Sequence, residues 1–155
     1  MNITYVKLRY GKVSTKDSIL YHLRDILPED KVNCAEVPDH LALFGDRKIE
    51  FAMHSCRPDL FIGCGDTAEV ILMNAHRFCI LINPSISQED EESLRDNDRV
   101  IILRTESPSD EIDKEFLENN LLPIVESLRS AAGSITDHLD NLVEMALSPT
   151  KQSPE

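Results

Sequence analysis

Several features that would place this chain in a membrane or in the secretory pathway are missing from its sequence. The longest uninterrupted apolar runs are about five residues, whereas a helix that spans a bilayer needs about 20. The N-terminus has neither the basic region nor the apolar core of a signal peptide. We therefore expect a cytoplasmic protein without a membrane partner.

Basic residues are also scarce. The chain has 16 Lys and Arg residues against 28 Asp and Glu residues, which gives a formal net charge of -12. A chain with this charge and no basic patch is repelled by nucleic acid and by anionic lipid. We expect neither as a partner, and the sequence leaves open whether the partner is a small molecule or another protein.

The spacings typical of metal sites and disulfide frameworks are absent as well. Cys34, Cys56, Cys64 and Cys79 include no Cys-x-x-Cys pair, and the histidines include no His-x-x-x-His pair. Zinc sites and disulfide-rich folds depend on such patterns. The sequence thus predicts free thiols, no bound metal and no cofactor. The acidic run at residues 89–92 is typical of a solvated helix face.

The chain does show a regular alternation of strand and helix patterns over 155 residues, enough for one domain with a core. Short runs rich in β-branched residues alternate with stretches whose apolar residues recur at helical spacing. Strands are predicted at residues 3–8, 31–37, 60–63, 77–82 and 100–103, and helices at residues 16–27, 41–56, 67–75, 88–98, 110–132 and 134–147. With right-handed crossovers, this order predicts a three-layer α/β/α sandwich around a five-stranded parallel sheet.

Local sequence predicts further details of the helices. The expected N-caps are Ser14 or Thr15, which end a turn at residues 11–15, then Ser87, and finally Ser109 or Asp110. Pro123 should kink the helix that contains it. The expected buried side of the helix at 41–56 consists of Phe44, Ile49, Phe51, Ala52 and Met53.

The C-terminal part of the chain divides into a helix and a tail. Residues 134–147 are predicted to form an amphipathic helix whose apolar stripe would be buried, either on the chain's own sheet or on a second subunit. A homodimer therefore remains open. Residues 148–155 are polar, contain two prolines and are predicted to be disordered. The predicted domain spans residues 1–147.

One β-turn-α-β unit carries the strongest functional pattern. A short apolar strand leads into Gly63-Cys64-Gly65-Asp66-Thr67, a helix follows, and a second apolar strand ends at Asn83-Pro84. The crossover implies that the two strands are parallel. A strand-turn-helix junction of this kind is also where an α/β-hydrolase presents its nucleophile.

The stretch from Pro58 to Pro84 resembles the YqiA-like family of small α/β-hydrolase-fold proteins, which are esterase-like. The matching segments are Pro58-Asp59-Leu60, Gly63, Ile82-Asn83-Pro84 and, near the C-terminus, Leu121-Leu122-Pro123-Ile124. The likeness covers most of residues 1–128. It implies a sheet in the strand order 2-1-3-4-5, with the active-site crevice at the carboxyl ends of the strands.

The chain departs from this family at the catalytic positions. Gly65 stands where the family has its nucleophilic serine, and Thr67 and Ala68 stand where it has two glycines. No histidine follows the first strand, where the chain has Tyr10, and none lies near residues 106–108, where the family has its catalytic histidine. A serine nucleophile works only beside a base and an oxyanion hole. The resemblance therefore implies an inactive pseudo-esterase that acts as a binding or interaction module.

Two alternatives remain open at this turn. A residual hydrolase of esterase or thioesterase type would use Cys64, or Asp66 with a histidine brought close by folding, although a buried cysteine and a helix N-cap are the simpler interpretations. An anion-binding protein would use the backbone amides of the turn, although Asp66 would repel a phosphate there. The candidate ligand-binding residues are Gly63, Cys64, Gly65, Asp66, Thr67 and Tyr10.

Overall fold

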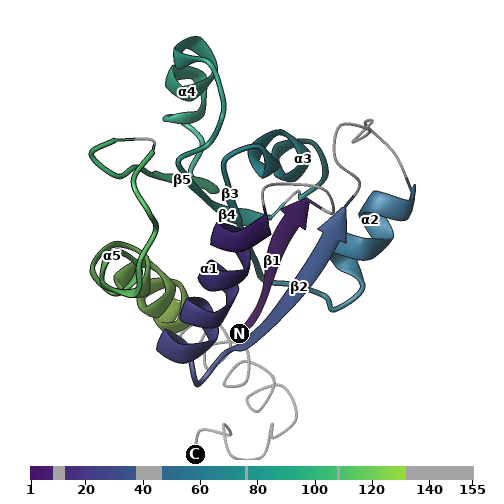
Figure 1. Cartoon of the computed structure of the whole chain (residues 1–155). Coiled ribbons are helices and arrows are strands. Elements are labelled where there is room, and N and C mark those ends of the chain that lie inside the picture. The colour runs from purple at the N-terminus through teal and green to yellow at the C-terminus, as the bar shows by residue number, and fades with distance from the viewer. Residues whose placement is uncertain (9–12, 38–46, 76, 108, 132–155) are drawn as a thin grey trace, which may run out of the picture.

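The computed structural model describes residues 1–8, 13–37, 47–75, 77–107 and 109–131, and it shows the predicted α/β fold (Figure 1). The strands are β1 (Asn2–Leu8), β2 (Lys31–Val37), β3 (Leu60–Cys64), β4 (Phe78–Ile82) and β5 (Val100–Leu103). The helices are α1 (Val13–Ile26), α2 (Arg47–His54), α3 (Thr67–Asn74), α4 (Gln88–Leu94) and α5 (Lys114–Asn120), and residues 122–131 are helical as well.

The strands form one parallel sheet in the order β2-β1-β3-β4-β5, as predicted. β3 lies at its centre and is buried along its whole length, as expected of a parallel strand covered on both faces. The order reverses between β1 and β3, so the carboxyl ends of these two strands flank a topological switch point. Ligands bind at such points in open α/β sheets. Tyr10, which follows β1, lies outside the described residues.

Helices cover both faces of the sheet (Figure 1). α1 and α5 pack on one face, where Leu23 and Leu117 enter a shared apolar core. α2 and α3 pack on the other face, where Met53 and Ile71 enter a second core. Because side chains alternate along a strand, successive residues of β3 contribute to the two cores in turn.

The junction between β3 and α3 is packed too closely for any side chain at Gly63. A Cβ atom there would overlap the Cδ1 atom of Ile71 and the Oγ1 atom of Thr67, both on α3. The Thr67 hydroxyl is itself buried and donates a 2.9 Å hydrogen bond to the carbonyl oxygen of Cys64. Gly63 therefore allows α3 to lie directly against the central strand.

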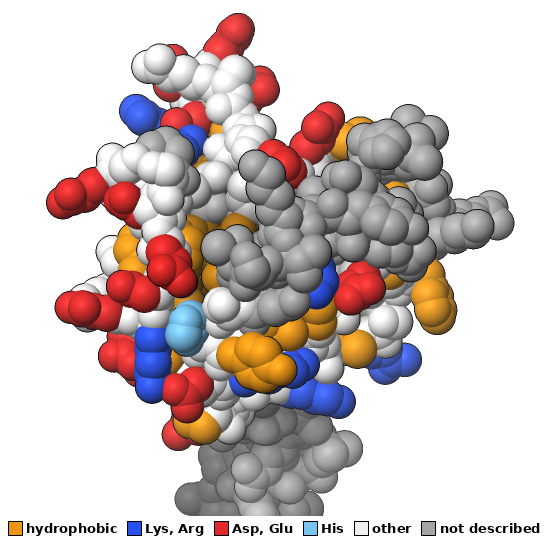
Figure 2. Space-filling model, in the orientation of Figure 1, with side chains coloured by type: hydrophobic (Ala, Val, Ile, Leu, Met, Phe, Trp, Pro, Cys, Tyr) orange, Lys and Arg blue, Asp and Glu red, His pale blue; other side chains and the backbone are white. Residues whose placement is uncertain are grey.

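Charge is unevenly distributed on the molecular surface. On the face shown in Figure 2, acidic side chains gather over α4 and around α5. Lys and Arg side chains gather lower on the same face, toward the edge where β1 and β2 begin (Figures 1 and 2). These basic side chains are interspersed with apolar, uncharged and acidic ones.

The structure confirms one predicted N-cap and corrects the others. The Ser87 hydroxyl accepts a 3.1 Å hydrogen bond from the amide of Asp90 at the start of α4. For α5 the cap is Asp113, which accepts a 2.8 Å bond from the amide of Phe116. Ser109 and Asp110 were wrong predictions because the loop before α5 uses them: the amide of Ser107 donates to Asp110, and the Ser107 and Ser109 hydroxyls share a bond.

Three other predicted details meet different outcomes. α1 begins at Val13, so Ser14 and Thr15 lie inside the helix and the predicted turn at residues 11–15 was too long. Phe51 is 76% exposed, because it lies about 200° around α2 from the buried Ile49. The helix that contains Pro123 is interrupted at Leu121, two residues before the proline, as expected for a residue that has no amide to donate.

Several predictions fall outside the described residues. These are Phe44, the helix at residues 134–147, the tail at residues 148–155, and with them the extent of the domain and the homodimer. No helix within the described ranges is both long enough and apolar enough to cross a membrane.

Candidate functional site

The turn between β3 and α3 is tied to the carboxyl end of β4. Gly65 has a φ of 56°, in the left-handed region that favours glycine. Its amide donates a 3.0 Å hydrogen bond to the carbonyl of Ile82, and its carbonyl accepts a 3.0 Å bond from the amide of Ser85. The chain therefore makes a sharp, well-anchored bend at the position where the resemblance to the YqiA-like family predicts a vacant nucleophile position.

The space in front of Gly65 is open. A Cβ atom built at this position would have the Ser85 hydroxyl oxygen as its nearest neighbour, at 3.9 Å. The bend could hold a side chain at the cost of the strained φ, and the chain has none. Ser85 is thus the side chain of the described residues that lies nearest to the vacant position.

Cys64 lies beside the vacant position in sequence but belongs to the opposite side of the sheet. Its side chain is 9% exposed and is part of the core between the sheet and α1 and α5. The other buried cysteine, Cys79, faces α3, and burial raises the pKa of its thiol to about 11. Cys34 and Cys56 are exposed. Cys64 is therefore placed as a core residue rather than as a group that faces a ligand.

The remaining turn residues bear on the anion-binding hypothesis. Asp66 occupies the N-cap position of α3 and is exposed, but its side chain makes no capping hydrogen bond. Amides that an anion would need are already used: Gly65 donates to Ile82, and Ala68 donates to the carbonyl of Gly65 at 3.3 Å. The Thr67 hydroxyl also has a partner, as described above. The amides of Gly65 and Ala68 and the Thr67 hydroxyl are therefore not available to an anion, and the exposed Asp66 carboxylate would repel one.

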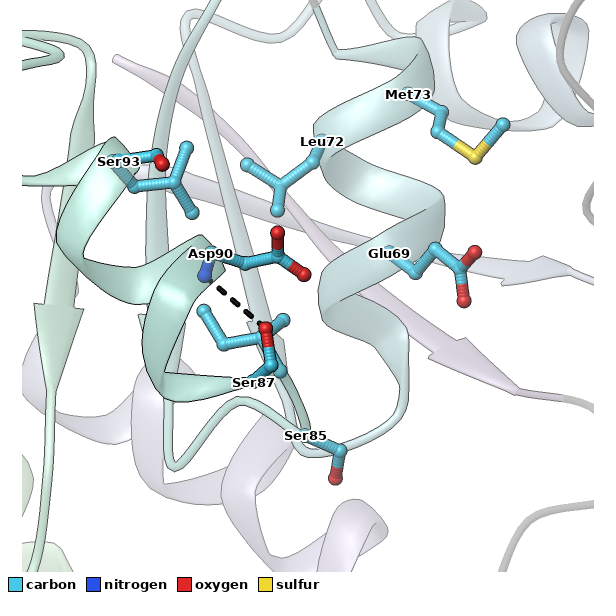
Figure 3. Close-up of a pocket in the computed structure, with 9 residues that line it drawn as sticks. Glu69, Leu72, Met73, Ser85, Ser87, Asp90 and Ser93 are labelled. Atoms are coloured by element: carbon cyan, nitrogen blue, oxygen red, sulfur yellow. Dashed lines mark hydrogen bonds between the residues drawn. The ribbon is translucent and has the colours of Figure 1, made fainter.

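A pocket of about 440 Å³ opens beside this turn, between α3 and α4 (Figure 3). Its apolar walls come from Leu72, Met73, Ile86 and Leu94, and its polar groups from Glu69, Ser85, Ser87, Asp90 and Ser93. Figure 3 shows the carboxylate of Asp90 reaching from α4 into the gap toward α3, while Glu69 and Met73 point away from α4. Asp90 is therefore the acidic group that a ligand in the gap would meet first.

Two polar groups of this pocket are available to a ligand. Neither Asp90 nor Glu69 forms an ion pair with any residue that the structure describes. The Ser87 hydroxyl caps α4 and the Ser93 hydroxyl donates to the carbonyl of Glu89, but the Ser85 hydroxyl has no partner within the described residues. A carboxylate and a hydroxyl beside apolar walls suit a ligand that has a cationic head and an apolar body.

One arginine fastens α4 to the sheet. The Nε atom of Arg104 lies 2.8 Å from a carboxylate oxygen of Glu91, and its Nη2 atom lies 3.5 Å from the carbonyl of Pro84. The hydrogen bond from this guanidinium lowers the pKa of the Glu91 carboxyl below its ordinary value. Because Arg104 is occupied by Glu91, it does not neutralise Asp90.

Histidines that could serve as a base are not found at this pocket among the described residues. His54, the last residue of α2, lies edge-on to Phe61 with the ring centroids 5.2 Å apart, and His22 lies on α1. Neither lines the pocket. His40, His76 and His138 lie outside the described residues. Within the described ranges no three His, Cys, Asp or Glu side chains are grouped to hold a metal ion.

The sequence analysis missed the residues that shape this pocket. Ser85 follows the Asn83-Pro84 end of a predicted strand, next to the turn in the neighbouring strand, and its position was a usable indication. Asp90 is exposed, as predicted for a solvated helix face, but the sequence did not show that α4 packs beside α3 and places Asp90 at a pocket. Comparison of the chain with protein-family models, curated proteins and solved structures gives no match.

Proposed function

We propose that this protein is a non-catalytic, α/β-hydrolase-like binding protein, of the YqiA-like type that its sequence resembles. Its ligand site is the pocket between α3 and α4, at the carboxyl edge of the sheet. The ligand is a small molecule with a cationic amine and an apolar group. The observation that carries this proposal is the unneutralised Asp90 carboxylate in an apolar pocket beside the vacant position at Gly65.

The absence of a placed nucleophile supports binding over hydrolysis. The bend at Gly65 has the form that would present a nucleophile, but it carries no side chain. Cys64 points into the core on the other face of the sheet. The residual-hydrolase hypothesis would need Ser85 or Asp66 to act with a base that the described residues do not supply at this pocket.

Electrostatics supports a cationic ligand over an anionic one. Asp66, Glu69 and Asp90 all lie at the turn or at the pocket, and the chain as a whole carries a net charge of -12. An anion bound there would be repelled by each of them, whereas an ammonium group would gain a charge-assisted hydrogen bond to Asp90. The hydroxyl of Ser85 offers a second acceptor.

The test is a titration with 2-phenylethylamine. Calorimetry measures the affinity, and the NMR shifts of the amides of Ser85 and Asp90 locate the binding site. The neutral isostere 2-phenylethanol is the matched ligand control. We expect the amine to bind and the alcohol to bind at least tenfold more weakly, because the alcohol makes no charge-assisted bond. Equal affinity for the amine and the alcohol would contradict the proposal.

Variants locate the site. Asp90→Asn should weaken amine binding about tenfold, and Ser85→Ala about threefold, since a hydrogen bond to a charged group contributes more than a neutral one. Glu92→Gln removes the same charge from the same helix at a residue that does not line the pocket. Unchanged binding in Asp90→Asn, or an equal loss in Glu92→Gln, would contradict the assignment.

Chemical labelling tests the loss of catalysis. We expect no adduct with a fluorophosphonate, and with limiting iodoacetamide we expect Cys34 and Cys56 to react before the buried Cys64 and Cys79. Peptide mapping by mass spectrometry reads both results. A stoichiometric fluorophosphonate adduct at Ser85, or fast and selective alkylation of Cys64, would show that the protein is an enzyme.

A further inference from the structure

A second pocket lies at the other edge of the sheet, where β4 and β5 begin. It has a volume of about 540 Å³ and is lined by His54, Ala75, Arg77, Phe78 and Arg99. A smaller cavity of about 270 Å³ adjoins it and shares Ala75, Arg77 and Arg99 with it. We refer to the two together as the amino-edge pocket. Nothing in the proposed function uses it.

The strand register brings the two arginines of this pocket together. Cys79 of β4 pairs with Val100 of β5. Arg77 lies two residues before Cys79 and Arg99 one residue before Val100, so the two arginines lie at the amino ends of adjacent strands. The amide of Cys79 also donates a 2.9 Å hydrogen bond to the carbonyl of Arg99. The backbone of Arg99 is therefore bonded to β4, and Arg77 directly precedes the first residue of that strand.

These arginines differ from others in the same protein. Arg104 is paired with Glu91, and Arg129 with Asp30 and Glu29. The guanidinium groups of Arg77 and Arg99, like those of Arg57 and Arg95, have no ion pair or hydrogen bond with any residue in the described ranges. In a chain with 28 acidic residues, two neighbouring guanidinium groups without a carboxylate partner leave an uncompensated positive charge at the mouth of a cavity.

The rest of the pocket is apolar or aromatic. Phe78 is 40% exposed at the start of β4, and its ring and the His54 imidazole line the same cavity as the arginines. Ile71, Cys79 and Val100 line the adjoining cavity. Small-molecule sites combine such apolar walls with a few polar groups that fix the ligand's orientation.

We propose that the amino-edge pocket binds a small organic anion, in which a phosphate or a carboxylate is attached to an apolar or aromatic group. Arg77 and Arg99 hold the anionic oxygens, since the guanidinium fork matches the geometry of both anions. Phe78, His54 and the adjoining cavity receive the apolar group. This site presents different polar groups from the amine site, although Leu72 and Leu94 line both the amine pocket and the adjoining cavity.

The experiment is a titration of the full chain with phenyl phosphate, phenylacetate, inorganic phosphate and 2-phenylethanol. Calorimetry measures the affinities, and the NMR shifts of the amides of Phe78, Cys79 and Val100 locate the binding site. We expect at least one of the two aromatic anions to bind tenfold or more tightly than inorganic phosphate or the alcohol, because only these carry both groups. Preference for phenyl phosphate assigns a phosphate ester, and preference for phenylacetate assigns a carboxylate.

Variants of the arginines separate this site from a general charge effect. Arg77→Gln and Arg99→Gln should each weaken binding about tenfold while the melting temperature stays unchanged, since both side chains are exposed. Arg95→Gln removes the same charge from the end of α4, at a residue that lines neither cavity. No amide shift with either aromatic anion, or equal losses in the three variants, would overturn the proposal.

Discussion

The two pockets on the α3 side of the sheet carry opposite charges. The carboxyl-edge pocket presents Asp90 without a described cation, and the amino-edge pocket presents Arg77 and Arg99 without a described carboxylate. A five-residue strand such as β4 spans roughly 16 Å, about twice the screening length at physiological salt. The charges are thus held too far apart to neutralise one another, and each remains available to a ligand.

The two pockets also differ in the stability of their walls. The amino-edge pocket is built on the starts of β4 and β5, which are fixed by the parallel ladder. The carboxyl-edge pocket depends on α4, which has no buried residue and is fastened by the Ser87 cap and by Arg104. Elements with few buried contacts open at low free energy. We therefore expect the carboxyl-edge pocket to adapt to its ligand and the amino-edge pocket to be preformed.

The largest predicted effect is the loss of unfolding free energy when a paired arginine loses its buried carboxylate partner. The side chain of Asp30 is fully buried and lies between the Met1 amino group, 3.3 Å away, and the Arg129 guanidinium. Asp30→Ala leaves the Met1 amino group and the Arg129 guanidinium without their buried partner and should cost about 3 kcal/mol of unfolding free energy. Urea denaturation measures this.

The control for Asp30 is Glu29, which also contacts Arg129 but is 76% exposed. Glu29→Gln should cost about 0.5 kcal/mol or less, as exposed ion pairs do. If Asp30→Ala proved as mild as Glu29→Gln, a paired arginine would mean no more for stability than the unpaired Arg77 and Arg99. The contrast on which the anion site rests would then be weakened.

The next effect concerns the wall that both pockets share. A Cβ atom at Gly63 would overlap Thr67 and Ile71, and the Thr67 hydroxyl cannot turn away without breaking its buried hydrogen bond to Cys64. Gly63→Ala should therefore destabilise the protein by about 2 kcal/mol and shift α3. Amine and anion binding should both weaken, because α3 lines both pockets.

Gly65→Ala is the matched control for Gly63→Ala, since Gly65 has room for a side chain but a φ of 56°. It should cost about 1 kcal/mol, from backbone strain alone, and leave anion binding unchanged. Urea denaturation measures the stability of both variants, and the amine and anion titrations measure their ligand binding. A loss of anion binding in Gly65→Ala would show that the two pockets are coupled.

The fold could be predicted from the sequence, because its information is local and repeated. β3 and β4 are continuous apolar runs, which buried parallel strands require, and the amphipathic stretches between them predict the crossovers. The errors occurred where tertiary contacts decide. The helix cap at Asp113 depended on hydrogen bonds that occupy Ser109 and Asp110 in the preceding loop.

The site was harder to predict, because its residues come from separate segments. The resemblance predicts a vacant nucleophile position at Gly65, but the sequence could not show that the Cys64 side chain enters the core of the opposite face. Ser85 and Asp90 join the site through the docking of α4, and Arg77 and Arg99 meet through the register of β4 and β5. Neither juxtaposition follows from residue spacing along the chain.

A smaller effect should distinguish the walls of the two pockets. Removing the cap with Ser87→Ala should cost about 1 kcal/mol, because the amide of Asp90 loses its acceptor. The loss should be confined to α4. Hydrogen exchange should therefore quicken about fivefold in α4 and stay unchanged at Cys79 and Val100. Amine binding should weaken more than anion binding, because α4 contributes Asp90, Ser93 and Leu94 to the carboxyl-edge pocket but only Leu94 to the amino-edge pocket. A uniform acceleration of hydrogen exchange in α4 and across the sheet would contradict the prediction that α4 opens separately.

The smallest effect is a pH dependence restricted to the acidic pocket. The Arg104 guanidinium lowers the pKa of Glu91 from its ordinary 4.5 in the folded state. The ion pair therefore contributes stability above that pKa and loses it as the pH falls through the lower, folded value. For an exposed pair the contribution is about 0.5 kcal/mol, so protection of the α4 amides should fall about twofold on acidification. Glu91→Gln should remove this pH dependence and leave α4 in its less protected state at all pH values, whereas Glu92→Gln should retain it. If the amides at the amino edge lost protection in the same pH range, the two pockets would not be stabilised independently.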